Sequence, residues 1–171
     1  EVVLDVDERA RHLALSTEAP DSDVARALEE AAEHARARGA TASAAELCEQ
    51  ACRLTPLDEP DAARRRTVAA ARYRFVAGDT ARARALLEEA LPFTSGGDGL
   101  AEALVLLGRL HRYEGDQPQA AELLRRALAE TSASDRVRAE AAQGLAATLF
   151  FMREELEIAQ VHAALGAELA A

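Results

Sequence analysis

Residues 101–130 decide the fold, and they read AEALVLLGRLHRYEGD followed by QPQAAELLRRALAE. Leucines recur at three- and four-residue spacings on both sides of Gly115-Asp116, which indicates two helices joined by a tight turn. Gly108 lets a partner helix approach closely, and Ala120 and Ala127 leave room for neighbouring backbones. Small residues at these positions predict a helix–turn–helix unit that stacks on others like it.

This unit resembles the tetratricopeptide repeat, and other parts of the chain match it. The turn glycine Gly115 has counterparts at Gly78 and Gly39, which precede it at nearly equal intervals along the sequence. A fourth copy, displaced forward by a similar interval, has Arg153 in place of the turn glycine. It aligns apolar residues with those of the other copies at Ile158, Val161 and Leu165. An atypical last copy is expected at the end of a repeat array.

The sequence therefore predicts an all-α, tetratricopeptide-like α–α superhelix of about four helix pairs plus a leading helix. The expected helices cover about 5–17, 22–38, 41–54, 60–77, 80–92, 99–114, 117–131, 135–152 and 154–170. They form repeats at about 22–56, 60–94, 99–131 and 135–171 within one helical-repeat domain, 1–171. Asp21 or Ser22 and Thr41 are the expected N-caps of the first pair.

The repeat register also predicts which side chains are buried. Those expected in the helix seams are Ala31, Leu47, Ala70, Leu87, Leu107, Leu124, Leu145 and Val161. Helical periodicity is already present by Arg9, His12 and Leu13, so we expect the chain to be a piece of a larger protein.

Composition narrows the function classes. The net charge of −10 disfavours direct nucleic-acid binding and binding to anionic membranes, since both need a dominant positive field. We find no secretory signal and no apolar run long enough to cross a bilayer. Only two cysteines are present, which excludes a disulfide framework and favours a reducing, cytoplasmic location.

Residues capable of chemistry do not form a recognisable motif. Cys48 and Cys52 have the i, i+4 spacing of a zinc half-site, but they fall on repeat positions that other copies fill with leucine, so we interpret them as small core residues. Each histidine lies on a different predicted helix: His12, His34, His111 and His162. The sequence thus predicts no catalytic, cofactor-binding or metal-binding residue and a non-enzymatic function.

One group of residues is a candidate binding surface. In stacked helix pairs the first helices line the concave side, and residues spaced three and four apart on each face the groove. The predicted groove residues are Arg65, Arg72, Phe75, Arg109, Arg112, Tyr113, Gln143 and Phe150, interleaved with Val68, Glu102, Val105, Glu140, Ala147 and Phe151. Arginine binds carboxylates in bidentate fashion and stacks on aromatic rings, so this pattern predicts a groove for an acidic peptide or a small anionic ligand. The alternative is that these arginines pair with glutamates on adjacent helices.

The first third of the chain resembles a more specific family. Residues 8–14 read ERARHLA, residues 24–35 read VARALEEAAEHA, and Arg38-Gly39-Ala40 and Leu54-Thr55-Pro56 follow. These segments are similar to the start of the helical arm of large ATP-binding LuxR-type transcriptional regulators of bacteria. In that family a nucleotide-binding switch domain precedes the arm and a helix-turn-helix domain follows it. One departure is Arg11 before His12-Leu13, where the family often has tryptophan.

The resemblance implies a sensor or protein-interaction arm, with a protein, an acidic peptide or a small anionic inducer as its partner. ATP-binding and DNA-contacting residues belong to other parts of such regulators, so none is carried over to this chain. A tetratricopeptide scaffold, free-standing or in another signalling ATPase, is the alternative interpretation.

Overall fold

A computed structural model describes residues 12–14, 17, 19–94 and 96–169, without the side chains of 155 and 157–169. Helices account for all the regular structure within these residues, so the all-α prediction is confirmed. The chain divides into two compact units, 1–95 and 96–171, each of which is described by itself.

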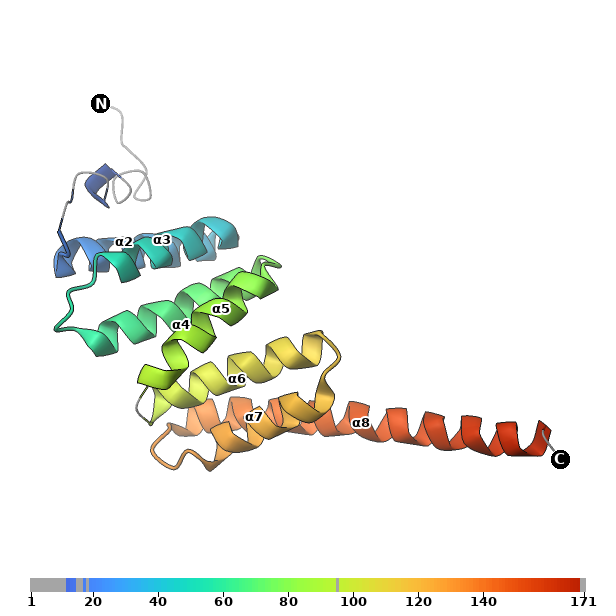
Figure 1. Ribbon diagram of the computed structural model, residues 1–171. Helices are drawn as coiled ribbons and strands as arrows, with labels where there is room; N and C mark the ends of the chain where they lie inside the picture. Colours follow the sequence, from blue (N-terminus) through green and yellow to red (C-terminus); the bar gives the residue numbers. More distant parts are fainter. Residues whose placement is uncertain (1–11, 15–16, 18, 95, 170–171) are drawn as a thin grey trace. The chain divides into compact units, whose positions relative to one another are not determined.

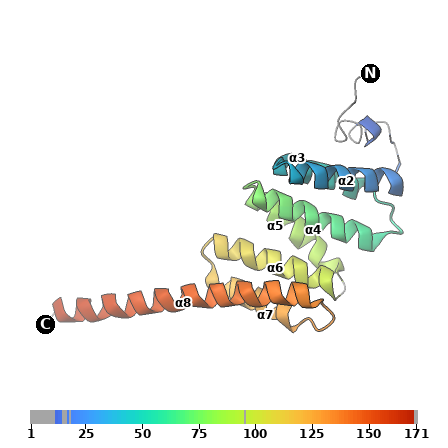
Figure 2. The same ribbon diagram turned by 180° about the vertical axis from the view of Figure 1, so that it is seen from behind.

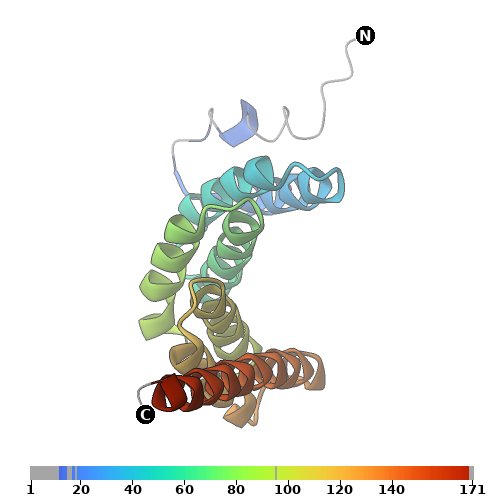
Figure 3. The same ribbon diagram turned by 90° about the vertical axis from the view of Figure 1, so that its right-hand side faces the viewer.

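The first unit contains two helix pairs and a short 3₁₀ helix (Figure 1). The elements are α2 (Ser22–Ala37), α3 (Thr41–Arg53), α4 (Pro60–Val76), α5 (Thr80–Ala90) and η1 (Leu91–Phe93). Each helix packs on the next, α2 on α3, α3 on α4 and α4 on α5. The α2–α3 pair lies beside the α4–α5 pair, and the views from behind and from the side show the same arrangement (Figure 2, Figure 3).

The second unit contains one helix pair and a long single helix. The pair is α6 (Asp98–Tyr113) and α7 (Gln117–Ala129), and the long helix is α8 (Asp135–Leu169). All three helices contact one another, because α8 packs against both α6 and α7. Within the described residues, no helix has the length and apolar character needed to cross a membrane.

Glycines at positive φ make the turn within each pair. Gly39, Gly78 and Gly115 have φ angles of 80°, 87° and 88°, a region that side-chain-bearing residues rarely adopt. Asp79 and Asp116 come directly after two of these glycines, and their carboxylates accept a backbone N–H of the following helix. The turn therefore ends one helix and begins the next within three residues.

Small residues in the seams let the backbones approach. At Gly108, an added Cβ would lie 2.8 Å from Cγ of Leu124 and 3.3 Å from the carbonyl oxygen of Ala120. At Gly144 in α8, it would lie 3.0 Å from a methyl group of the same Leu124. Leu124 is fully buried, so α6, α7 and α8 meet around one side chain.

Most predicted helix ends agree with the structure to within two residues, but the fourth pair is wrong. Residues 135–152 and 154–170 were expected to form two helices, whereas α8 is continuous from Asp135 to Leu169. The physical reason is the missing breaker, since Met152, Arg153 and Glu154 are all good helix formers.

One predicted N-cap is wrong, and most of the predicted leading helix lies outside the described residues. Thr41 is the first residue of α3 and the N-cap is Ala40, which follows the turn glycine and makes no side-chain cap; Asp21 does cap α2. Of the predicted leading helix at 5–17, residues 12–14 are described and helical. The rest of it lies largely outside the described residues.

Six of the predicted seam residues are buried: Ala31, Leu47, Ala70, Leu87, Leu107 and Leu124. Leu145 is only half-buried, because α8 has no second helix of its own to cover it. The side chain of Val161 lies outside the description.

We expect Leu107→Ala to lower the free energy of unfolding by about 2–5 kcal/mol, because it removes a side chain that is only 4% exposed from the α6 seam. Leu57→Ala is the matched control, since Leu57 is 98% exposed and its truncation leaves no cavity. Urea unfolding followed by circular dichroism measures both. A change below about 0.5 kcal/mol for Leu107→Ala would contradict the seam assignment.

Candidate functional site

The predicted groove residues lie on both units. Arg65, Arg72 and Phe75 are on α4 of the first unit, whereas the other members, Arg109, Arg112, Tyr113, Gln143 and Phe150, are on α6 and α8 of the second. Each unit is placed by itself, so the groove as a whole stays a prediction. One part of it is wrong: Val68 and Val105, expected on the open face, are buried in the helix seams.

The alternative pairing of arginines with glutamates on adjacent helices does occur, at arginines outside the predicted set. Arg66 of α4 donates to Glu29 of α2 at 3.0 Å, and Arg136 of α8 pairs with Glu102 of α6. Sequence alone does not separate these arginines from the predicted ones, since Arg65 is exposed whereas Arg66, its neighbour on the same helix, is buried.

A polar layer joins α2 to α4. Arg66 is only 5% exposed, and besides Glu29 it donates to Oγ1 of Thr55 at 2.7 Å. Thr55 in turn donates to the carbonyl of Ala51 at 2.7 Å. This chain of bonds satisfies the buried guanidinium and holds the loop that begins after α3.

Further along the same two helices, the Tyr73 hydroxyl donates to Glu33. Burial and this hydrogen bond to a carboxylate together raise the pKa of Tyr73. The hydrogen bond from Tyr73 lowers the pKa of Glu33, although partial burial opposes that effect.

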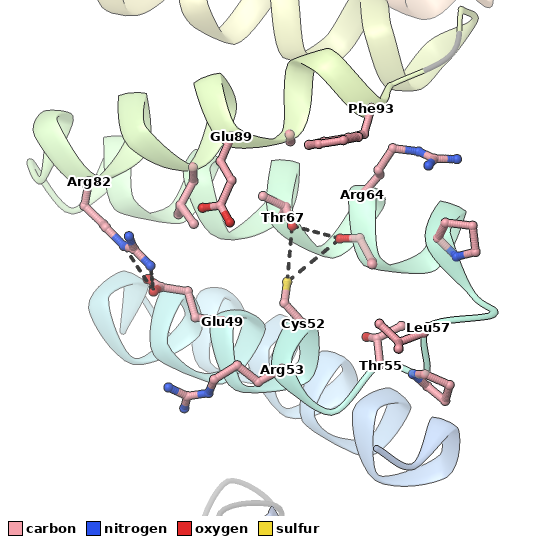
Figure 4. Close-up of a pocket in the computed structure, with 15 residues that line it drawn as sticks. Glu49, Cys52, Arg53, Thr55, Leu57, Arg64, Thr67, Arg82, Glu89 and Phe93 are labelled. Atoms are coloured by element: carbon pink, nitrogen blue, oxygen red, sulfur yellow. Dashed lines mark hydrogen bonds and ion pairs between the residues drawn. The ribbon is translucent and has the colours of Figure 1, made fainter. Parts of the chain in front are cut away.

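The structure contains a pocket in the first unit that the sequence interpretation missed. It has a volume of about 650 Å³ and is formed by α3, the loop before α4, α4, α5 and η1. Figure 4 shows Cys52 and Thr67 at its centre, with Leu57, Arg64 and Phe93 toward one end and Glu49 and Arg82 toward the other. Both helix pairs of the unit therefore supply its walls.

Two large apolar side chains that line the pocket are exposed. Leu57 is 98% exposed and Phe93 is 73% exposed, and both line the opening. Leu57 follows Pro56 in the loop, and Phe93 ends the 3₁₀ helix after α5. Large apolar side chains held in water beside a concavity are typical of a surface that a partner covers.

The centre of the pocket is polar but internally bonded. Sγ of Cys52 lies 3.5 Å from Oγ1 of Thr67, and that hydroxyl donates to the carbonyl of Ala63 at 2.9 Å. Burial raises the pKa of the Cys52 thiol, and burial raises that of Cys48 to about 12. Both thiols are therefore protonated at neutral pH, which does not suit a nucleophile or a metal ligand.

Glu49 organises the other end of the pocket. Its carboxylate accepts from Arg74 at 2.7 Å and from Arg82 at 2.7 Å, so it joins α3 to α4 and to α5. Burial alone would raise the pKa of Glu49, but the hydrogen bonds from Arg82 and Arg74 outweigh it and hold the pKa below the ordinary value of 4.5.

Three further cationic or anionic groups complete the lining: Arg53 and Arg64 near the loop, and Glu89 on α5. Arg64 also pairs with Asp61 one turn earlier. The arrangement offers guanidinium groups beside an apolar opening, which can bind a carboxylate attached to an apolar body. Among the described residues, no three histidine, cysteine, aspartate or glutamate side chains gather as a metal site would require.

Two signals in the sequence point to this pocket. Leu57 stands in a turn segment, Leu57-Asp58-Glu59-Pro60, and Phe93 stands after the last predicted turn of a helix, positions where a core residue is not expected. The groove was predicted from the first helices of the pairs alone, whereas the pocket is lined by the second helices α3 and α5 and by a loop, as well as by the first helix α4.

Comparison of the chain with protein-family models and with curated proteins finds no match.

We expect Glu49→Gln to lower the free energy of unfolding at neutral pH by about 1–3 kcal/mol, because hydrogen bonds to two arginines lose their charge. The folded-state pKa of Glu49 is lowered, so its contribution is present above the ordinary pKa and is lost as the pH falls through the folded-state pKa. Wild-type stability should therefore fall between about pH 5 and pH 3 more steeply than that of the variant.

Urea unfolding at each pH measures this difference, and Glu46→Gln, at an exposed position of the same helix, is the control. Parallel pH profiles for wild type and Glu49→Gln would contradict the role given to Glu49.

Proposed function

We propose that this chain is a non-catalytic binding arm whose helix pairs accept a protein or acidic peptide, or a small anionic inducer. The observation that supports it most is the pocket of the first unit, with Leu57 and Phe93 exposed on its rim. An apolar side chain of a partner would remove both from water, which is favourable by roughly 25 cal/mol per Å² of apolar surface buried.

The charged lining supports an acidic partner. Arg53, Arg64 and Arg82 line the pocket against Glu49 and Glu89, and Glu49 is already engaged by Arg74 and Arg82. A ligand carboxylate can therefore approach guanidinium groups at the rim, while the apolar part of the ligand contacts Leu57 and Phe93.

The position of the pocket supports a sensing role. Its walls come from α3 of one pair and α4 and α5 of the next, so a bound partner touches two consecutive repeats. A ligand that binds one spacing of these helices better than another shifts the population toward that spacing. In a larger protein, this shift is a signal that an attached domain can receive.

We assign the arm to a LuxR-type, ATP-dependent transcriptional regulator of the bacterial cytoplasm. The support is the resemblance of the segment 1–56, including Arg38-Gly39-Ala40 and Leu54-Thr55-Pro56. The parent gene tests this assignment. A phosphate-loop domain encoded upstream and a helix-turn-helix encoded downstream would support it, and a reading frame with neither would favour the tetratricopeptide scaffold.

The binding site is tested with fluorescein-labelled acidic peptides that each carry one leucine or phenylalanine between glutamates. We expect fluorescence anisotropy to show binding that weakens as salt rises, because exposed charges are screened. The double variant Leu57→Ala/Phe93→Ala should lose more than about tenfold in affinity, equal to roughly 1.4 kcal/mol. Both side chains are exposed, so the fold should tolerate their truncation.

Two further variants complete the design. Tyr113→Ala removes an exposed aromatic ring in the second unit and should bind like wild type if the pocket is the site. Arg109→Ala/Arg112→Ala tests the predicted groove. Loss of binding in that variant, with normal binding by the Leu57/Phe93 variant, would move the site to the groove, and no binding by any peptide would contradict the acidic-peptide proposal.

A further inference from the structure

The pocket of the first unit has an apolar lining that follows its helices. Leu86, Ala90 and Phe93 are spaced four and three residues apart, so they lie along one side of α5 and its 3₁₀ extension. Pro60 and Ala63, three residues apart, line the pocket from the first turn of α4. These five residues form an elongated surface for hydrocarbon, which we call the apolar strip.

The uncharged polar side chains of the pocket are already bonded within the protein. Thr67 donates its hydroxyl to the carbonyl of Ala63 at 2.9 Å, and Thr55 donates its hydroxyl to the carbonyl of Ala51 at 2.7 Å. Each hydroxyl has one hydrogen to donate, so neither keeps one for a ligand. Cys52 is a weak donor and lies against Thr67. A sugar or a peptide backbone would therefore leave water for a lining with few hydrogen-bonding partners, which is costly.

The two ends of the pocket differ in charge (Figure 4). At one end, Glu49 holds Arg82 through hydrogen bonds of 2.7 and 3.2 Å, and Glu89 adds a second carboxylate there. At the other end, Arg64 donates to Asp61 through Nη2. A guanidinium has five N–H donors, so Arg64 retains donors on its other nitrogens.

The bond to Asp61 leaves Arg64 able to bind a second carboxylate. The Asp61 side chain is 78% exposed, so water screens its attraction for Arg64. The Arg64 side chain is only 21% exposed, so a carboxylate that reaches it from within the pocket is bonded where less water competes. Glu89 repels an anion from the opposite end. The charges thus direct a ligand carboxylate to Arg64 and its apolar body to the strip.

We propose that the pocket takes a small amphiphilic carboxylate, a ligand with one carboxylate on Arg64 and a hydrocarbon body against Leu57 and the apolar strip. This inference rests on the binding function proposed above and narrows it, because it selects a small anionic ligand over a peptide. The size agrees, since a volume of about 650 Å³ lies in the usual range for small-molecule sites.

Titration of the isotope-labelled full chain, followed by its backbone amide signals in nuclear magnetic resonance spectra, tests this ligand class with three small molecules. Octanoate has a carboxylate and a hydrocarbon body, octanol has a similar body without charge, and gluconate has a carboxylate on a hydroxyl-rich body. We expect octanoate to bind at least about tenfold more tightly than either of the others, because each of them lacks one of the two contacts. The signals that shift should belong to residues 49–93.

The variant Arg64→Gln separates the carboxylate contact from the apolar one. It should weaken octanoate binding by more than about fivefold and leave octanol binding unchanged, because only the carboxylate contacts Arg64. Arg26→Gln is the matched control. Arg26 also pairs with an aspartate three residues earlier, Asp23, near the start of a helix, but it lies outside the pocket lining, so this variant should bind octanoate like wild type.

Equal affinities for octanoate and octanol would overturn this ligand class, and so would octanoate binding that survives Arg64→Gln or gluconate binding tighter than that of octanoate. Binding of the acidic peptides at Leu57 and Phe93 without binding of octanoate would overturn the inference and leave the proposed function standing. Absence of binding by every one of these ligands would contradict both.

Discussion

Close approach of helix backbones is the constraint on which the second unit depends. Leu124 of α7 is fully buried, and Gly108 of α6 and Gly144 of α8 both lie so near it that a Cβ would fall within 3.0 Å of its side chain. A chain with 4% aromatic residues cannot fill wide gaps between helices, so its seams must be narrow. The two glycines make them narrow and place α8 against both α6 and α7.

The first unit combines narrow apolar seams with a few buried polar contacts. Its seams are rich in alanine, and between α2 and α4 a buried arginine, Arg66, bonds to Glu29 and Thr55. Such groups add little net stability compared with apolar packing, but they are satisfied in one register only. Because Thr55 is held there, the loop that follows is anchored at its start. Leu57, two residues later, lines the pocket.

The turns and helices of the first three pairs could be predicted because each depends on local signals, such as Gly115-Asp116 and the leucine spacing around it. The continuity of α8 was missed because Arg153 was interpreted as a degenerate turn, although nothing near it breaks a helix. The polar layer and the pocket could not be predicted. Glu29 and Arg66 are far apart in the sequence and look like any exposed pair, and the pocket exists only once three helices are packed.

The two open surfaces of this protein differ in chemistry, and that difference separates their behaviour. The pocket has arginines beside Leu57 and Phe93, so the binding of an anionic ligand there would depend on charges that salt screens. Residues 141–152 of α8 carry no charge, so an interaction there depends on removing apolar surface from water, which salt does not weaken. Raising the salt concentration would thus act on the two surfaces in different ways.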